Sequence, residues 1–221
     1  MTTKMPVSTA SPTKLDLFLD RLAARCPSGR LIFALDATMS REPTWGQACE
    51  LQAEMFGEAA AVGGLEISIA YYRGSEWRAS EWVTDAHQLG KAMRSVACVG
   101  GYTQIAKILD HARRTHDKTP ISALVFVGDA VEESLDDLCG RANELGPRGV
   151  RCFMFQEGSD KQAEQAFREI ARLTAGAFCR FAPGSAQELG ALLRAVAVFA
   201  AGGLKALQGK KEAVKLLEQL K

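Results

Sequence analysis

"LIFALDATMS" (residues 31–40) places an uninterrupted apolar run directly before a polar loop. Five consecutive apolar residues without polar alternation indicate a strand that is buried on both faces of a sheet. The run ends at Asp36, and hydroxyl side chains follow at alternate positions, Thr38 and Ser40. Positions two apart in an extended loop project to the same side, so this loop can direct one carboxylate and two hydroxyls to a single point.

Outward from this stretch, apolar runs of strand length alternate with segments of helical periodicity. The alternation predicts an α/β fold of the Rossmann-like type, with a doubly wound, mainly parallel central sheet and helices on both faces. One antiparallel edge strand is expected, because residues 64–74 and 75–83 read as a hairpin. Further strands are expected at 121–129, 149–158 and 176–182, and helices from about 13 and 43, over 85–97, 103–115 and 133–145, and after 158 and 184.

The chain divides into one folded unit and two short flanking segments. Residues 13–202 are expected to form the single α/β domain. Residues 1–12 are small, polar and proline-containing, which predicts a flexible arm, and 203–221 are expected to form a helical tail. The helix that follows residue 158 is expected to open with a capping box of Ser159 and Gln162.

Composition narrows the classes of partner. The 27 basic and 26 acidic residues give a net charge of +1, which argues against a nucleic-acid-binding face. The six cysteines are scattered without a C-x-x-C pair, so neither a disulfide framework nor a zinc site is indicated. No stretch reads as a secretory signal or a membrane span, so we expect a cytoplasmic protein with no membrane partner.

A second carboxylate matches the first. Asp129 ends the apolar run "ISALVFVGD", as Asp36 ends its own run. If the two strands are neighbours about 4.8 Å apart, both carboxylates face one crevice at the carboxyl edge of the sheet. Their repulsion, roughly 3 kcal/mol at a separation of ~5 Å and an effective dielectric of ~20, is relieved either by a shared proton or by a divalent cation. Oxygen ligands without histidine or cysteine favour the cation, and among cations Mg²⁺, with Mn²⁺ or Ca²⁺ as other hard dications.

A third motif completes a known pattern. "GGYTQI", residues 100–105, places two glycines before Thr103 at the start of a predicted helix. Together with "DATMS" and "VFVGDA" it resembles the metal-ion-dependent adhesion site (MIDAS) of the von Willebrand factor A (VWA) or integrin I-domain family. The resemblance extends roughly over residues 30–201 and is closest to a short, stand-alone intracellular member.

What the resemblance implies is a metal site and a binding function. Asp36, Thr38 and Ser40 would hold Mg²⁺ from the first loop, and Thr103 and Asp129 would complete the shell directly or through water. Family members mostly are not enzymes but bind partner proteins, often through an acidic side chain of the partner. The expected function is therefore a divalent-metal-dependent protein-binding module that meets an Asp or Glu of an unidentified protein.

Several residues near the site have two interpretations. We place Arg41, Trp45 and Tyr102 on the rim that meets the partner, although Trp45 is equally well explained as a helix-start residue that packs on the sheet. Glu132 and Glu133 are interpreted as the acidic first turn of the helix at 133–145.

Two other functions stay open. One is a Mg²⁺-dependent phosphohydrolase, against which stands the absence of a G-x-x-x-x-G-K-[ST] or G-x-S-x-G motif. The other is a metal-independent scaffold on the same VWA fold.

Overall fold

The computed structural model describes residues 29–46, 65–182 and 186–207. In these ranges the chain forms a six-stranded sheet of order β3-β2-β1-β4-β5-β6. Every neighbouring pair is parallel except β2 and β3, which pair antiparallel at one edge. The predicted mainly parallel sheet with one antiparallel edge strand is therefore confirmed. The strands are β1 (Gly29–Asp36), β2 (Leu65–Arg73), β3 (Glu76–Ala79), β4 (Ala123–Gly128), β5 (Arg151–Glu157) and β6 (Ala177–Phe181).

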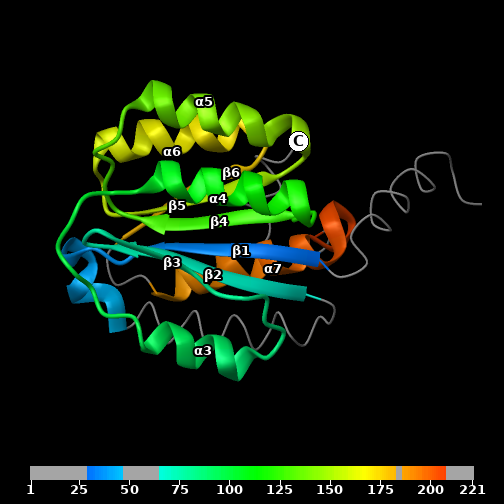
Figure 1. Cartoon of the computed structure of the whole chain (residues 1–221), viewed down its shortest axis with the longest axis horizontal. Helices are drawn as coiled ribbons and strands as arrows, with labels where there is room; N and C mark the ends of the chain where they lie inside the picture. Colours follow the sequence, from blue (N-terminus) through cyan, green and yellow to red (C-terminus); the bar gives the residue numbers. More distant parts are fainter. Residues whose placement is uncertain (1–28, 47–64, 183–185, 208–221) are drawn as a thin grey trace, which may run out of the picture.

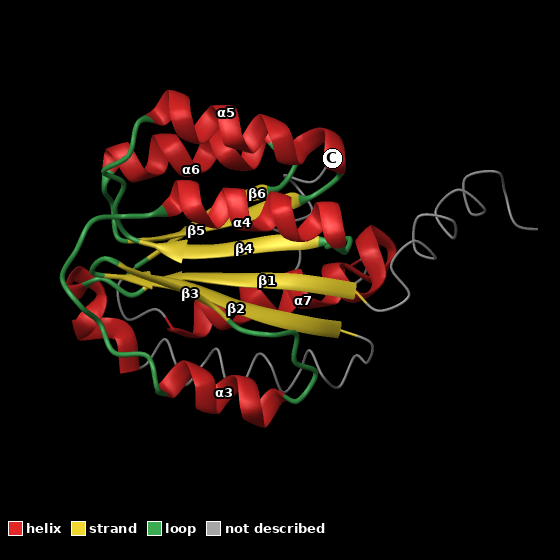
Figure 2. Cartoon of the chain, viewed as in Figure 1, coloured by secondary structure: helices red, strands yellow, loops and turns green. Residues whose placement is uncertain are grey.

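Helices cover both faces of the sheet, as predicted (Figures 1 and 2). One face packs against α4, α5 and α6, and the other against α3 and α7. Their bounds are α3 (Ala86–Arg94), α4 (Ile105–Lys118), α5 (Leu135–Leu145), α6 (Lys161–Leu173) and α7 (Ala186–Leu207), with short 3₁₀ turns η1 (Met39–Arg41) and η2 (Gly146–Arg148). Helical backbone angles in α7 are interrupted at Gly203, where φ is 66°.

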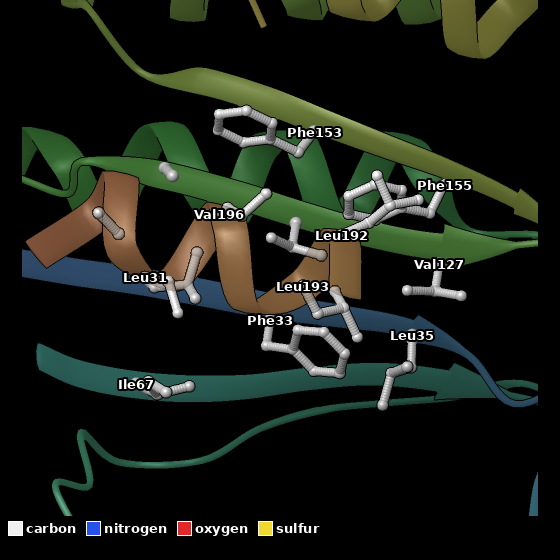
Figure 3. Close-up of a cluster of buried hydrophobic side chains, with 14 of the residues drawn as sticks. Leu31, Phe33, Leu35, Ile67, Val127, Phe153, Phe155, Leu192, Leu193 and Val196 are labelled. Carbon is white, nitrogen blue, oxygen red and sulfur yellow. The ribbon is translucent and has the colours of Figure 1, made fainter. Parts of the chain in front are cut away.

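Alternate residues of β1 enter two separate cores. Leu31 and Phe33 point to the α7 side, where Figure 3 shows Phe33 beside Leu193, and Ile32 and Ala34 point to the α4 side. All of these side chains are fully buried. Burying a large apolar side chain stabilises the fold by about 1.5–3 kcal/mol. Because helices cover both faces of β1, apolar residues at every position of the strand are buried, which explains the unbroken apolar run in the sequence.

Three helix starts differ from the sequence prediction, and the first is that of α4, which begins at Ile105, two residues later than predicted. α6 begins after Asp160, whose carboxylate accepts a hydrogen bond of 2.6 Å from the Ala163 backbone N–H. The predicted capping box of Ser159 and Gln162 is therefore wrong by one residue. α5 begins at Leu135, two residues later than predicted, so Glu133 precedes the helix.

Some predictions lie outside the described residues. These are the arm at 1–12, the helix from 13, most of the helix from 43 and the end of the tail beyond 207. Within residues 29–46, 65–182 and 186–207, no helix combines the length and the apolar character needed to cross a membrane.

Candidate metal centre

The two predicted carboxylates lie at the point where the sheet changes winding direction. Asp36 is the last residue of β1, and Asp129 directly follows β4. β1 and β4 are adjacent and parallel, and the chain adds β2 and β3 on one side of β1 before it adds β4, β5 and β6 on the other. In open α/β sheets, ligands bind outside the carboxyl ends of the strands at such a switch point. This edge is the left-hand end of the sheet in Figure 1.

The first loop brings Asp36, Thr38 and Ser40 together through a turn. Asp36 is fully buried, and its Oδ1 accepts a hydrogen bond of 2.8 Å from the Thr38 backbone N–H. The Thr38 and Ser40 hydroxyl oxygens lie 3.1 Å apart. Thr38 is extended, but residues 39–41 form the 3₁₀ turn η1. The predicted extended loop is therefore wrong in its second half, although the hydroxyls do converge.

Tyr72 supplies a hydrogen bond that the sequence did not indicate. It lies on β2, opposite Asp36 in the parallel register, and it is fully buried. Its hydroxyl donates a hydrogen bond of 2.9 Å to Oδ2 of Asp36. Each oxygen of Asp36 thus accepts one hydrogen bond, which leaves each with further acceptor capacity.

Thr103 and Glu132 are joined by two hydrogen bonds that run in opposite directions. The Thr103 backbone N–H donates to Oε2 of Glu132 at 2.7 Å, and the Glu132 backbone N–H donates to the Thr103 hydroxyl oxygen at 3.0 Å. Glu133 accepts hydrogen bonds of 2.7 and 2.8 Å from the backbone N–H groups of Ile105 and Ala106.

These contacts correct the interpretation of the two glutamates. Glu132 and Glu133 stand before α5, not in its first turn, and they satisfy backbone donors at the start of α4. One signal in the sequence was available. Thr103 is followed three residues later by Ala106, so the start of α4 has no acidic residue of its own for a capping box.

Direct contacts bring the three loops of the predicted site together. The Val99 backbone N–H donates to the Ala37 carbonyl at 3.1 Å, which joins the loop before α4 to the loop after β1. The Thr103–Glu132 pair joins the start of α4 to the loop after β4. Gly128, the last residue of β4, lies beside Asp36: a Cβ at this position would lie 3.4 Å from the Cβ of Asp36 and 2.8 Å from the Phe126 ring.

The two carboxyl groups of the candidate site are not equally satisfied by their surroundings. Burial raises the pKa of the Asp36 carboxyl, and the nearby Asp129 carboxylate adds to the rise, while hydrogen bonds from Thr38 and Tyr72 oppose it. Oδ1 of Asp129 is buried, and no described residue donates a hydrogen bond to it. A buried acceptor without a donor is costly, and a cation beside it would remove the cost.

The residues present fit a hard cation with oxygen ligands. Within the described part of the chain, no group of three or more His, Cys, Asp or Glu side chains could hold a metal ion. The predicted set is of a different kind, two carboxylates with three hydroxyls, and Mg²⁺ with retained water suits such a set. The set consists of Asp36, Thr38, Ser40, Thr103 and Asp129.

Two of the three predicted rim residues lie in the interior. Arg41 is 1% exposed, and its guanidinium donates to the Asp36 carbonyl oxygen at 2.9 Å and to Oε2 of Glu157 at 3.2 Å. Trp45 is 9% exposed, and its indole N–H donates to the Val96 carbonyl at 2.7 Å. The rim prediction is wrong for both, because buried side chains cannot meet a partner, and the packing alternative holds for Trp45.

Tyr102 does lie on the surface and is 78% exposed. The sequence interpretation missed Met39 and Val99, which are 50% and 43% exposed. With Tyr102 they are the large apolar side chains that stand exposed among the described residues. All three belong to the loops that carry or adjoin the candidate ligands.

Comparison with known structures finds the same architecture at low sequence identity. The VWA domain of SpRpn10 aligns with a TM-score of 0.60 and 11% identity, over 73% of this chain and 95% of that one. The vWF domain of the type V pili tip protein Mfa5 from Porphyromonas gingivalis aligns with a TM-score of 0.61 and 11% identity, over 76% and 93%. BatB from Bacteroides thetaiotaomicron aligns with a TM-score of 0.55 and 14% identity, over 73% and 95%.

Comparison by sequence gives no match, neither to a protein-family model nor to a curated protein. The fold is therefore established by structure. The sheet order, the antiparallel edge strand, the helices on both faces and the three alignments agree with one another, and the chain has a VWA-like fold.

Proposed function

We propose that this chain is a metal-dependent protein-binding module. Mg²⁺, or another hard dication such as Mn²⁺ or Ca²⁺, would be held by the two carboxylates and three hydroxyls of the predicted set, directly or through water. The observation that carries the proposal is the buried Oδ1 of Asp129, which has no hydrogen-bond donor among the described residues and lies near the buried Asp36 carboxylate.

The chain's own residues define what such a site can do. Two carboxylates balance the charge of a dication, and the hydroxyls of Thr38, Ser40 and Thr103 add oxygens without further charge. When bound, the ion supplies a Lewis-acidic position that an Asp or Glu oxygen of a partner protein can fill. Without the ion, Asp36 and Asp129 repel such a carboxylate, so partner binding would require the metal.

The surface beside the site supports a protein partner. Met39, Val99 and Tyr102 expose apolar area on the surrounding loops. Exposed apolar side chains near a polar anchor are typical of protein interfaces, in which aromatic residues and methionine are enriched. The VWA-like fold itself is consistent with an interaction module, and one structural neighbour is a pili tip protein.

We further propose that the protein acts in the cytoplasm and is not an enzyme. Cys98, Cys139 and Cys152, which lie in the described residues, are free thiols, which is the expected state in a reducing compartment. Cys152 and Cys179 are buried among apolar side chains.

Titration with Mg²⁺ tests the metal site first. A ligand bound only by the native state adds about 2.7 kcal/mol of stability at a hundred times its Kd, so the melting temperature of the wild type should rise with Mg²⁺ concentration. Asp36→Ala and Asp129→Ala should each fold and lose this rise. Affinity capture in Mg²⁺ and in chelator, with wild type and both variants, then tests the partner. A partner retained by the double variant in chelator would refute the metal-dependent mechanism.

A metal-independent scaffold is the second candidate, and one observation favours it. Both carboxylate oxygens of Asp36 already accept hydrogen bonds, from Thr38 and Tyr72, so this residue is satisfied without a cation. If Mg²⁺ leaves the melting temperature of the wild type unchanged, this candidate replaces the first. Turnover of p-nitrophenyl phosphate that needs both Mg²⁺ and Asp36 would instead identify a phosphohydrolase.

A further inference from the structure

The reciprocal pair of Thr103 and Glu132 fixes one candidate ligand from outside its own helix. Thr103 is buried, and it stands just before α4, whereas Glu132 stands in the loop between β4 and α5. Hydrogen bonds of 2.7 and 3.0 Å run in opposite directions between the two residues. The pair therefore restrains both the backbone and the hydroxyl of Thr103 relative to the loop that carries Asp129.

The Thr103 hydroxyl keeps capacity for a further interaction. Its oxygen accepts the Glu132 backbone N–H, which uses one of its two lone pairs. The second lone pair and the hydroxyl proton have no partner in the pair itself. A ligand oxygen held in this way is oriented before a cation arrives, as outer residues commonly orient the ligands of a metal.

We propose that Glu132 is a positioning residue for the metal site, acting on Thr103 through its acceptor oxygen and not through its charge. This inference rests on the proposed metal-binding function. Glu132 itself is not assigned as a ligand, and the inference concerns only the hydrogen bond that its Oε2 accepts from the Thr103 N–H.

Glu133 provides a matched control within the same loop. It carries the same charge and caps the same helix, but its two oxygens accept hydrogen bonds from Ile105 and Ala106 instead of Thr103. Removal of Glu133 therefore removes charge and helix capping while the contact to Thr103 remains. A difference between the two positions isolates the contact with Thr103.

The experiment uses Tb³⁺ as a luminescent hard cation on the full chain, with Mg²⁺ affinity measured by competition. Luminescence lifetimes in H₂O and D₂O count the water molecules bound to Tb³⁺, which a purely structural role would not change. We expect Glu132→Ala to weaken Mg²⁺ binding by about ten- to a hundredfold and to raise the water count, because the Thr103 backbone loses the acceptor that fixes it and the hydroxyl is then held only by the Glu132 backbone N–H. Glu132→Gln keeps an acceptor oxygen and should keep the wild-type affinity and water count.

Glu133→Ala should lower the melting temperature but leave Mg²⁺ affinity and the water count unchanged. If Glu132→Ala fails to fold, the comparison of Glu132→Gln with wild type still decides between acceptor and charge. If the wild type binds Mg²⁺ and Glu132→Ala has the same affinity and water count, this inference is wrong but the proposed function is still supported. If Glu132→Gln binds Mg²⁺ as weakly as Glu132→Ala does, the inference is also wrong, because the role of Glu132 would then depend on its charge. Failure of the wild type to bind either ion overturns the proposed function and this inference together.

Discussion

At the scale of single residues, Tyr72 shows how much a buried carboxylate depends on its neighbours. Its hydroxyl donates to Oδ2 of Asp36 at 2.9 Å, and both residues are fully buried. Tyr72→Phe removes this donor without changing the ring that stacks on Phe126. We expect a loss of about 1–3 kcal/mol in the free energy of unfolding, the usual cost of a buried acceptor left without its donor. Urea denaturation measures the loss. The same substitution at the neighbouring Tyr71 is the control, and equal losses at both positions would contradict the role given to the hydrogen bond.

The pKa of Asp36 leads to a second prediction, for the metal-free protein. Burial, with repulsion from Asp129, raises the pKa of this carboxyl above its ordinary value of 3.8, so the native state holds the proton more tightly than the unfolded state. Stability from this residue is fully present below pH 3.8 and is lost as pH rises through the raised pKa. The asparagine in Asp36→Asn cannot ionise, so this variant does not lose stability at this position as the pH rises.

In chelator, the melting temperature of Asp36→Asn relative to wild type should therefore increase as pH rises from about 4 to 7. The asparagine oxygen can still accept the Thr38 N–H, and its amide group can donate to the Tyr72 hydroxyl. Thermal melts of both proteins over this pH range measure the difference. A difference that does not change with pH would contradict the assignment of the raised pKa.

The residues whose proximity could be predicted from the sequence are those whose pattern is local. Asp36, Thr38 and Ser40 follow one another on a single loop, and the structure brings them together. Arg41 was predicted to lie on the rim that meets the partner, but it is buried. Its partner Glu157 lies 116 positions away in the sequence, and no local sequence pattern predicts such a contact.

At the scale of elements, the Arg41 side chain contacts the carboxyl ends of three strands. Its guanidinium donates to the carbonyl of Asp36 on β1, lies 3.4 Å from the carbonyl of Val127 on β4 and binds Glu157 on β5. Nη2 lies 3.2 Å from the same Glu157 oxygen without the alignment of a hydrogen bond. Arg41→Met should cost about 3–5 kcal/mol, because it leaves a buried carboxylate without its cation.

A double-mutant cycle in urea measures the coupling between the two side chains. Arg41→Met with Glu157→Leu should cost less than the sum of the single changes, since neither charge is then left unpaired. The ion pair of Arg30 with Glu66 is the exposed comparison. It joins β1 and β2 near their amino ends, and about a quarter of each side chain is exposed. Its removal should lower the free energy of unfolding by only about 0–1 kcal/mol. Additive losses at Arg41 and Glu157 would show that the two side chains are not coupled and would contradict the role given to this ion pair.

Strands were predicted better than helix starts, for a physical reason. A buried strand shows as an apolar run in its own sequence, as β1 and β4 do. A helix start depends on which oxygen reaches its free N–H groups, and that oxygen can come from elsewhere. In α6 it comes from Asp160, next to the predicted Ser159, but in α4 it comes from Glu133, 28 positions from Ile105.

At the scale of the whole molecule, the alternation of strands and helices indicated the sheet type but not the strand order. Two carboxylates on separate runs meet only if their strands are neighbours, and periodicity does not contain that information. The observed order places β1 beside β4, so the condition is met. The candidate site thus depends on the topology, and a cation there would connect segments that are distant in sequence.

This connection predicts a spatial pattern in amide hydrogen exchange. If Mg²⁺ binds at the candidate site, it raises the free energy of those local openings that dismantle the site and leaves other openings unchanged. Exchange should therefore slow in three separate loops at the carboxyl edge, residues 36–41, 98–104 and 129–133. Mass spectrometry of peptides from the full chain, with Mg²⁺ and with chelator, measures the change.

The loops at the opposite edge of the same sheet are the internal control. Residues 119–122, 146–150 and 174–176 lead into β4, β5 and β6 at their amino ends. Their exchange should be the same with and without Mg²⁺, because no candidate ligand lies there. Asp129→Ala should abolish protection in all three loops at the carboxyl edge, since each of them contributes to one site. Protection spread evenly over both edges would show that Mg²⁺ stabilises the protein nonspecifically, and protection of a single loop would show that the three segments do not share one cation.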